Sequence, residues 1–357
     1  MWLSDMVVGL GGGKRAGIRE MITVFTSATS SYLPNARILA KSLSDAHPDW
    51  WFVLLFNDIT PKGINWAMEP FDEVFFAHWL PIPRFRRWAF GQHVVEFCTA
   101  TKGLMATHLL EERGSKGVIY LDPDTVVFSP LKEVLELLRQ HDIILTPHLT
   151  DPEADTNTDA IESHEVAALK HGTFNLGFFA LARRPQAGQY LHWWTDRLLK
   201  FSQIDFERGL FTDQKWCNLA PYLFDGVYSL TDRAYNVATW NMRNRVIRRG
   251  EGGQWTVNGR PLRFYHFSGF GNDFAWADRE LEMFDDGAGD LGELWQYYKS
   301  LYRENSNGTA PPWHWGHFVN GVPITREDQQ RYRSDLALQQ AFPDPYSDGC
   351  FIALRQA

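Results

Sequence analysis

Two aspartates, Asp122 and Asp124, stand one residue apart directly after the apolar run 117–121. Such a run predicts a buried strand, and two carboxylates at its end can point to one cation. Carboxylate oxygens suit Mg²⁺ or Mn²⁺, which proteins commonly share with substrate phosphates. A solvated turn around Pro123 is the alternative interpretation, and the apolar strand before it favours the metal site.

A histidine, His266, follows Phe264 and Tyr265 in a second apolar run, 262–267. A neutral imidazole is a good ligand for Mn²⁺ and would complete a set of three with the two aspartates. The local sequence supports a core histidine with satisfied hydrogen bonds equally well, so both interpretations stay open here.

Two further polar pairs are candidates for binding a sugar. Asn175 and Gly177 lie within an apolar run, where an asparagine can donate to and accept from sugar hydroxyls and a glycine often marks a close approach of the backbone to a ligand. Asp213 and Gln214 open a short helix after Thr212. The alternatives are a bulge for the first pair and an N-cap, at Thr212 or Asp213, for the second.

The segment before His266 is locally basic because it contains Arg243, Arg245, Arg248, Arg249, Arg260 and Arg263. A diphosphate or a phospholipid-linked acceptor would favour such a cluster, since guanidinium groups bind phosphates with paired hydrogen bonds. A solvated charged face is the simpler interpretation, and the local sequence favours it.

The elements that would position these residues follow a regular order in the first half of the chain. Apolar runs alternate with helical patterns, which indicates strands buried on both faces of a doubly wound α/β sheet. The expected strands are 21–26, 51–56, 71–76, 117–121, 125–128 and 142–146, and the expected helices are 33–46, 94–112 and 130–140. Such sheets bind ligands at the carboxyl ends of their strands, where 26–31 and 122–124 fall.

The second half of the chain is less regular. The Asp-rich stretch 151–163 is typical of a mobile loop. After it we expect strands at 174–183 and 262–267 and helices at 186–201, 213–219 and 291–302. We therefore predict a flexible leader over 1–20, one α/β domain over 21–286 and a helical, aromatic C-terminal extension over 287–357.

Composition excludes several classes of protein. The net charge of −8 argues against a nucleic-acid binder, and no run approaches the ~20 apolar residues that span a bilayer. Three widely spaced cysteines fit a reducing compartment better than a disulfide scaffold. Aromatic residues reach 15%, including 15 Trp, which fits either a carbohydrate site or a large aromatic core.

Taken in order, these motifs resemble the GT-A-fold retaining glycosyltransferases of family 8, the group of glycogenin and the bacterial lipopolysaccharide galactosyltransferases. The likeness covers about residues 21–269. Its anchor points are Tyr32, Lys102, Asp122 to Asp124, Asn175 to Gly177, Thr212 to Gln214, Tyr235 to Asn236 and His266 to Gly269. The fold it implies is a Rossmann-like, doubly wound mixed sheet in a single GT-A domain with a C-terminal helical extension.

The resemblance also implies a role for each matching residue. Asp122, Asp124 and His266 would bind Mn²⁺ or Mg²⁺, and Tyr32 would stack on the nucleobase. Asp213 and Gln214 would lie at the catalytic centre, with Gln214 near the face of the anomeric carbon opposite the leaving group. Together with residues at strand ends, the predicted donor-binding set is Thr26, Ser27, Tyr32, Asp58, Lys102, Asp122, Asn175, Gly177, Asp213, Gln214 and Gly269.

The implied activity is hexosyl transfer, with retention, from a nucleotide diphosphate sugar to a glycan or lipid-linked acceptor. A UDP-sugar donor, surface polysaccharide or lipopolysaccharide assembly, and a cytoplasmic location with peripheral contact at the inner membrane face would go with it. Three positions depart from the family pattern, namely Ala28, Thr99 and Asn272, where members carry an acid, an arginine and a lysine. A replacement cation for the phosphates would then come from the arginine cluster.

Three rival interpretations remain. An inverting GT-A enzyme needs a carboxylate base, for which Asp155, Asp159 and Asp213 are candidates. A nucleotidyltransferase would need a Gly-rich, basic loop after its first strand, and 26–35 shows neither feature. A non-catalytic carbohydrate-binding protein could keep the same fold, although the intact metal-ligand set counts against it.

Overall fold

A computed structural model describes residues 8–9, 21–154, 156–270, 289–306, 308 and 310–355. Its strands are β1 (Val8–Gly9), β2 (Ile22–Ala28), β3 (Trp51–Phe56), β4 (Glu73–Phe76), β5 (Gly117–Leu121), β6 (Thr125–Val127), β7 (Ile143–Pro147), β8 (Phe174–Ala182), β9 (Val227–Ser229), β10 (Ile247–Arg249), β11 (Trp255–Val257), β12 (Arg260–Pro261) and β13 (Phe264–His266). Its helices are α1 (Leu33–Ala46), α2 (Phe85–Phe90), α3 (Val94–Thr107), α4 (Lys132–Leu138), α5 (Thr158–Ala160), α6 (Ala167–His171), α7 (Pro185–Phe201), α8 (Gln214–Cys217), α9 (Ala220–Leu223), α11 (Leu291–Asn305), α12 (Arg326–Ser334), α13 (Leu336–Ala341) and α14 (Asp348–Arg355).

The central sheet confirms the predicted α/β class. In the described residues its strand order is β1-β4-β3-β2-β5-β8-β7-β9. Strands β4, β3, β2 and β5 pair in parallel, whereas β8 runs antiparallel to both of its neighbours. The apolar runs that predicted β2, β3, β5 and β8 are almost wholly buried, as expected for strands covered on both faces.

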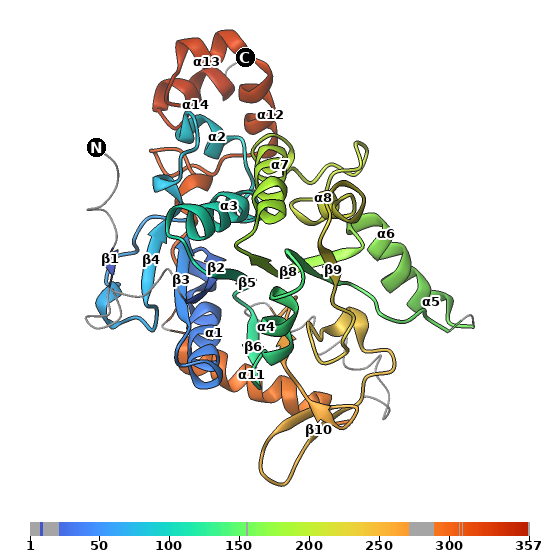
Figure 1. Ribbon diagram of the computed structural model, residues 1–357. Coiled ribbons are helices and arrows are strands. Elements are labelled where there is room, and N and C mark those ends of the chain that lie inside the picture. Colours follow the sequence, from blue (N-terminus) through green and yellow to red (C-terminus); the bar gives the residue numbers. More distant parts are fainter. Residues whose placement is uncertain are drawn as a thin grey trace.

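Helices cover both faces of this sheet, with α3 and α7 on one side and α1 and α4 on the other (Figure 1). Alternate residues of one strand serve the two layers, because side chains on a strand point in turn to opposite faces. Phe25 packs with α3 and α7, for example, whereas its neighbour Val24 packs with α1. The doubly wound arrangement therefore follows from the pleat of the strands.

A two-stranded ribbon joins two distant parts of the chain beneath the main sheet. Strand β6 begins just after Asp124 and pairs antiparallel with β13, so that Thr125 lies opposite His266. The amide of Phe267 donates to the carbonyl of Asp124 at 2.8 Å. This ribbon brings His266 beside the aspartates, although the two motifs are far apart in sequence.

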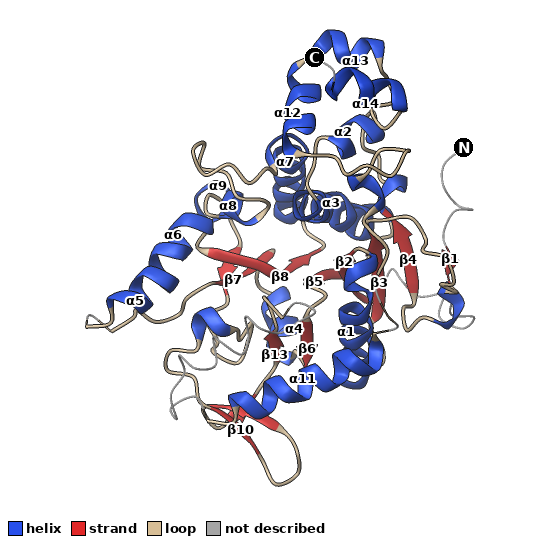
Figure 2. Ribbon diagram, turned by 180° about the vertical axis from the view of Figure 1, so that it is seen from behind, coloured by secondary structure: helices blue, strands red, loops and turns tan. Residues whose placement is uncertain are grey.

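The C-terminal extension is helical, as the sequence predicted. Helices α12, α13 and α14 cluster around α2 at one end of the molecule (Figure 2). Arg326 on α12 binds the buried carboxylate of Glu96 at 2.8 Å, and Gln329 donates to the carbonyl of Gln92 at 2.7 Å. The described helices include none long and apolar enough to cross a membrane.

Two of the predicted domain limits fall on parts of the chain outside the described residues. The expected leader 1–20 is described only at Val8–Gly9, which pairs antiparallel with β4. The boundary expected at 286/287 lies between 270 and 289, and it therefore stays a prediction.

The prediction of a loop over 151–163 was wrong for its second part. A helical segment runs without a break from Thr158 to His171, through α5, a π-helical turn at Ile161–Val166 and α6. The side chain of Asn157 caps it by accepting from the amide of Ala160 at 3.0 Å. This cap supplies a hydrogen-bond partner for one of the backbone amides that lack one at the start of a helix. The high aspartate content of the segment led to the prediction of a loop, and the capping role of Asn157 was overlooked.

Candidate functional site

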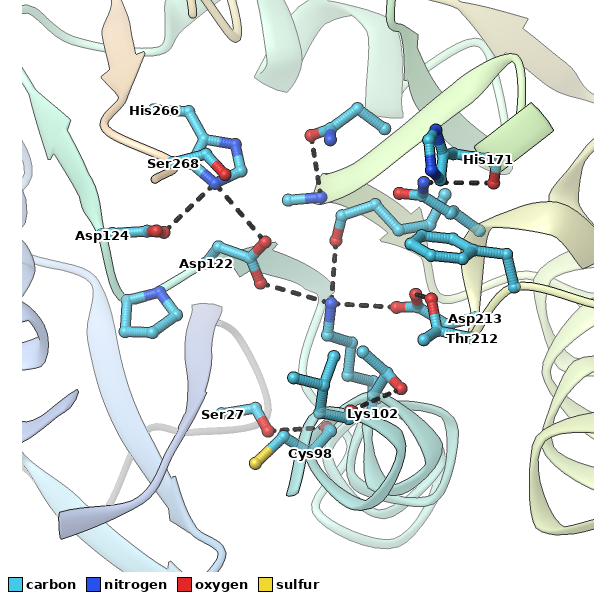
Figure 3. A pocket seen from close by; sticks show the side chains of 18 of the residues that line it. Ser27, Cys98, Lys102, Asp122, Asp124, His171, Thr212, Asp213, His266 and Ser268 are labelled. Carbon is cyan, nitrogen blue, oxygen red and sulfur yellow. Dashed lines mark hydrogen bonds and ion pairs between the residues drawn. The ribbon is translucent and has the colours of Figure 1, made fainter. Parts of the chain in front are cut away.

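The largest cluster of predicted site residues lines one pocket of about 510 Å³ at the carboxyl ends of β2 and β5. Strand β5 delivers Asp122 and Pro123, α3 delivers Lys102, and the start of α8 delivers Asp213 and Gln214. Figure 3 shows Lys102 between Asp122 and Asp213, with His266 facing Asp122 and Asp124 from the opposite side. This is the edge of the sheet where the sequence predicted a ligand.

The three predicted metal ligands come together in this pocket. Ligand atoms of Asp122, Asp124 and His266 all lie within 4.8 Å of one another. The Nε2 atom of His266 is 3.1 Å from Asp124 Oδ1 and 3.6 Å from Asp122 Oδ2. Burial disfavours a charge on His266, but the carboxylates of Asp124 and Asp122 outweigh it and raise the pKa of the imidazole. A divalent cation would offset the charge of the two carboxylates in the same way.

The absence of a side chain at Gly177 leaves the space that the His266 ring occupies. A Cβ atom at position 177 would lie 2.4 Å from His266 Cε1 and 2.8 Å from Asn175 Oδ1, closer than real Cβ atoms approach other atoms. The sequence predicted a close approach of this backbone to a ligand, and the group that lies against Gly177 is instead the His266 ring. The Nδ1 atom of that ring is buried without a hydrogen-bond partner in the described residues.

Lys102 connects the aspartate motif to the start of α8. Its Nζ lies 2.9 Å from Asp213 Oδ2 and 3.3 Å from Asp122 Oδ1, and it donates to the carbonyl of Leu176 at 3.0 Å. The ammonium group also stands over the ring of Tyr120, 4.2 Å from its centroid. Burial alone would lower the pKa of Lys102, but Asp122 and Asp213 reverse the shift and raise it. The lysine is therefore held as a cation between two carboxylates.

The two aspartates that contact Lys102 differ in their surroundings. For Asp122, the cations of Lys102 and His266 overcome the effect of burial and lower the pKa of its carboxyl. For Asp213, burial prevails over Lys102 and raises the pKa. Asp122 therefore stays ionised to a lower pH than Asp213.

The amide of Asn175 is already occupied by the protein. Its Oδ1 accepts from the amide of Gly177 at 3.1 Å and from Asn236 Nδ2 at 3.0 Å. Its Nδ2 lies 3.2 Å from Nε2 of His148. Asn175 therefore orients the wall of the pocket, and little of its hydrogen-bonding capacity is left for sugar hydroxyls.

The turn before α8 is strained. Thr212 has a φ of 45°, which is unusual for a β-branched residue, and such strain collects at functional sites. The neighbouring Asp213 makes no capping hydrogen bond to α8, since its carboxylate turns to Lys102. Gln214 donates to the carbonyl of His171 at 3.2 Å, which ties α8 to the end of α6.

Of the predicted metal, catalytic and donor-binding residues, most line the pocket: Ser27, Tyr32, Lys102, Asp122, Asp124, Asn175, Gly177, Asp213, Gln214 and His266. Thr26, Asp58 and Gly269 do not. The Asp58 carboxylate instead accepts from the Ser30 hydroxyl at 2.8 Å and from the His314 amide at 3.1 Å, so it joins the tail to the sheet.

Two of the positions that depart from the family pattern, Ala28 and Thr99, line the pocket, and Asn272 lies outside the described residues. None of the six clustered arginines lines it within the described part of the chain. Five of them contact carboxylates on other elements, for example Arg243 with Glu153 and Arg263 with Glu133. The interpretation as a solvated face holds for Arg248, Arg249 and Arg260, whose side chains are exposed. It was wrong for Arg245, which is buried.

Several lining residues escaped the sequence analysis: Val94, Val95, Cys98, His148, Ser163, His164, Ala167, Ala168, His171, Phe211, Trp240 and Ser268. His148 follows the carboxyl end of β7, so the strand-end rule could have identified it. The helical segment 158–171 carries five others; of these, Ser163 fell within the predicted loop 151–163, and no element was predicted for the remaining four. Trp240 had no local signal.

Comparison with known proteins gives distant matches. No family model matches this chain. Two Bacillus subtilis (strain 168) proteins that carry the description uncharacterized, YfnD and YfnF, are each 24% identical to it, over 206 and 178 residues. These alignments cover 56% and 49% of this chain and span 63% and 57% of the two relatives.

Solved structures similar to this chain include several glycosyltransferases. The galactosyltransferase LgtC, in complex with donor and acceptor sugar analogs, has a TM-score of 0.46 and 15% identity, covering 82% of this chain and 98% of that chain. GlyE from Streptococcus pneumoniae TIGR4 has a TM-score of 0.41 and 15% identity, and the match covers 80% of this chain and 62% of that chain. The bifunctional glycosyltransferase WbbM has a TM-score of 0.42 and 13% identity, and the match covers 79% of this chain and 51% of that chain. At these values the case for a function has to rest on the site itself.

Proposed function

We propose that this protein transfers a hexosyl unit from a nucleotide diphosphate sugar to a hydroxyl group of a glycan or lipid-linked acceptor. The observation that carries the proposal is the set Asp122, Asp124 and His266, gathered at the carboxyl end of β5 in the wall of the pocket of about 510 Å³. Two carboxylates and an imidazole at a strand end suit a cation that is shared with a diphosphate. UDP-sugars are the favoured donors, on the resemblance of the motifs.

The residues present fit Mn²⁺ or Mg²⁺. Asp122 stays ionised, and His266 turns one nitrogen toward both carboxylates while Gly177 leaves room for its ring. Carboxylate oxygens suit Mg²⁺ or Mn²⁺, and a neutral imidazole can join them as a ligand of Mn²⁺. When bound, such a cation would offset the negative charge that develops on a departing diphosphate.

The side chains of the chain itself would position the reactants. Tyr32 is 43% exposed at the pocket wall, where its ring is free to stack on a nucleobase. Lys102 holds Asp122 and Asp213 in fixed positions, so the groups around the reacting carbon would need little rearrangement. Gln214 lies beside Asp213 at the start of α8, on the side of the pocket assigned to the donor sugar.

In the proposed reaction, the bond between the anomeric carbon and the diphosphate oxygen breaks, and its electron pair leaves with the nucleoside diphosphate. The acceptor hydroxyl oxygen forms the new bond to that carbon. With retention, its proton passes to a diphosphate oxygen on the same face. With inversion it would need a carboxylate base, and of the described candidates Asp213 lines the pocket whereas Asp159 is exposed outside it. The configuration of the product, determined by NMR, distinguishes the two.

The resemblance of the motifs supports the wider context that we propose. Surface polysaccharide or lipopolysaccharide assembly would supply a glycan or lipid-linked acceptor. The reaction would then take place in the cytoplasm, with peripheral contact at the inner face of the membrane.

The proposal is tested by metal binding and nucleotide binding measured separately from turnover. We expect Mn²⁺ titration by electron paramagnetic resonance to show a site that weakens at least ~10-fold in Asp124→Asn, because a ligand is lost. In a thermal-shift comparison of UDP-, GDP- and dTDP-sugars, we expect the sugars of only one nucleotide base to raise the melting temperature of the protein. We expect this rise only when Mn²⁺ or Mg²⁺ is present. A ligand at about 100 times its Kd adds about 2.7 kcal/mol of stability.

The matched control is Asp225→Asn, which changes an exposed aspartate outside the pocket in the same way. It should bind Mn²⁺ and nucleotide sugar like the parent protein. Failure of every nucleotide sugar to stabilise the parent protein with metal, or to be hydrolysed by it, would refute the proposed donor site. The carbohydrate-binding interpretation would then replace it.

A further inference from the structure

Two imidazoles on one helical segment line the pocket, and no role has yet been assigned to them. The segment 158–171 contributes Ser163, His164, Ala167, Ala168 and His171 to the lining. His164 and His171 are seven residues apart, which is about two turns of a helix, so they project from the same side. The two alanines between them carry no polar side-chain atom. The two imidazoles are therefore the main polar groups that this segment offers to a ligand.

The ring of His164 is held by a buried carboxylate. Its Nδ1 lies 2.8 Å from Oε1 of Glu153, a residue that is 8% exposed. Arg243 donates to the other oxygen of that carboxylate at 3.2 Å, and Glu165 accepts from the Glu153 amide at 2.6 Å. An ionised carboxylate can only accept, so Nδ1 carries the hydrogen. In the neutral ring, Nε2 is then the atom with the lone pair.

The ring of His171 is held by the backbone instead. Its Nδ1 lies 2.8 Å from the carbonyl oxygen of Ala167, and a carbonyl can only accept. The rings of Phe206 and Phe211 stand edge to face with the imidazole, with centroids 5.5 Å and 4.7 Å away. Nδ1 of this ring therefore also carries a hydrogen, which leaves the lone pair of the neutral ring on Nε2. Figure 3 shows His171 among the side chains that line the pocket.

Both Nε2 atoms are open to a ligand. Neither makes a hydrogen bond to a described residue, and neither is one of the buried polar atoms that lack a partner there. The other two histidines that line the pocket in the described part of the chain are already engaged. Nε2 of His148 accepts from the amide of Asn175 at 3.2 Å, and Nε2 of His266 faces Asp122 and Asp124.

A nitrogen with a lone pair selects for a group that can donate a hydrogen bond. In a nucleotide sugar or a glycan, the sugar hydroxyls can donate, whereas an ionised diphosphate can only accept. Two unprotonated nitrogens therefore disfavour the diphosphate and favour a sugar ring. A site built to accept from a hydroxyl discriminates against an analogue without that hydrogen, because its acceptor is then left unpaired.

We propose that His164 and His171 bind hydroxyl groups of a sugar in this pocket, each accepting a hydrogen bond at Nε2. The hydroxyls belong to the transferred hexose or to the acceptor sugar, which present the same chemistry. The two histidines then determine specificity, and Glu153 is a positioning residue for the ring of His164. This inference rests on the proposed function, because it takes the occupants of the pocket to be sugars.

The test combines variants with sugar analogues. His164→Leu and His171→Leu each remove one acceptor nitrogen, and deoxyfluoro sugars replace one hydroxyl at a time by a fluorine, which cannot donate. The donor series consists of the glucose and galactose derivatives of UDP, GDP and dTDP with Mn²⁺, measured by isothermal titration calorimetry. The acceptor series consists of methyl glucoside and methyl galactoside, measured by ligand-observed NMR.

In the parent protein, we expect one position of the fluorine to weaken binding about 10-fold for each histidine. The same fluorine should change binding less than ~3-fold in the variant without the matching histidine, because the hydrogen bond is already lost. His164→Gln keeps an acceptor oxygen and an amide that can donate to Glu153, so it should restore most of the discrimination. The series in which the coupling appears identifies the sugar that supplies the hydroxyl.

His192→Leu, at an exposed position outside the pocket lining, is the matched control and should discriminate like the parent protein. Equal effects of every fluorine in the parent protein and in a leucine variant would overturn the inference for that histidine. No sugar binding in either series would overturn it for both. A loss of affinity for UDP as large as that for the UDP-sugar would mean that the ring contacts the diphosphate, and would also overturn it. Coupling in the methyl glycoside series of a protein that binds no nucleotide sugar would contradict the proposed function instead.

Discussion

At the scale of single residues, the approach of His266 to strand β8 decides whether the candidate metal site can form. The ring lies against the backbone of Gly177, where a side chain of any size would overlap it. Asn175 borders the same space, and its amide is fixed by Asn236 and by the Gly177 amide. The imidazole and the Asn175 amide therefore share the space beside Gly177.

This contact predicts the effect of Gly177→Ala. The added methyl group should displace the His266 ring and weaken Mn²⁺ binding by about 10- to 100-fold, the range seen when the support of a metal ligand is lost. Overpacking should also cost about 1 to 3 kcal/mol in stability. Mn²⁺ titration and urea unfolding measure the two effects.

The control is Gly188→Ala, where the methyl group would meet only the tip of the Glu111 side chain at 3.0 Å, away from the pocket. It should bind Mn²⁺ like the parent protein. Normal Mn²⁺ affinity in Gly177→Ala would mean that His266 is not a ligand.

At the scale of elements, the ends of helices are linked by side chains that were not expected to contact one another. His47 follows the last residue of α1 and stacks on Trp50 with ring centroids 3.5 Å apart. Its Nε2 accepts from the amide of Leu131, the residue that precedes α4, at 2.8 Å. The two helices that cover one face of the sheet are joined in this way.

This bond predicts how stability depends on pH. Burial lowers the pKa of His47 to about 4, from about 6.5 in the unfolded chain. Protonation then favours the unfolded chain, so the contribution of His47 to stability is complete above pH 6.5 and is lost as the pH falls toward 4. His47→Gln keeps an acceptor that does not titrate, and its stability should fall less steeply over this range.

Urea unfolding followed by tryptophan fluorescence at pH 4 to 7.5 measures the difference. His192→Gln, at an exposed position of α7, should leave the pH dependence of the parent protein unchanged. A His47→Gln profile parallel to that of the parent would contradict the assignment. His148, whose pKa is also lowered to about 4 by burial, keeps its own share of the pH dependence in both proteins.

At the scale of the whole molecule, the C-terminal helices support the helix that carries part of the pocket. Glu96 near the start of α3 is fully buried and receives Arg326 from α12, the amide of Ile204 and the amide of His93. Val95 and Lys102 on the same helix line the pocket. Among the described residues, the extension therefore contacts the helix that carries Val95 and Lys102 and does not itself line the pocket.

Removal of the Arg326 side chain should destabilise the protein by about 1 to 3 kcal/mol, because a buried carboxylate loses a charged hydrogen-bond partner. Hydrogen exchange should quicken first at the start of α3. Arg303→Ala, at an exposed position of α11, is the control. In a double-mutant cycle with Glu96→Gln, additive losses would show that the two residues are not coupled.

The sequence by itself determined the class of the fold and the core of the candidate site. Local patterns carry this information, because an apolar run buried on both faces has to be a strand of a layered sheet, and polar residues at its carboxyl end have to lie at the edge that binds ligands. Asp122, Asp124 and His266 were found in this way, and Asp213 came from the local pattern around Thr212. The resemblance of the motifs then added Lys102.

Only the tertiary structure decided how these residues are used. The pairing of β6 with β13 places His266 beside Asp124. Lys102 forms ion pairs with two carboxylates, Asp122 and Asp213, that are distant from it in sequence. Trp240 reaches the pocket from a loop without any local signal. Such contacts depend on which surfaces meet after the sheet and helices have packed, and residue type and spacing along the chain do not contain that information.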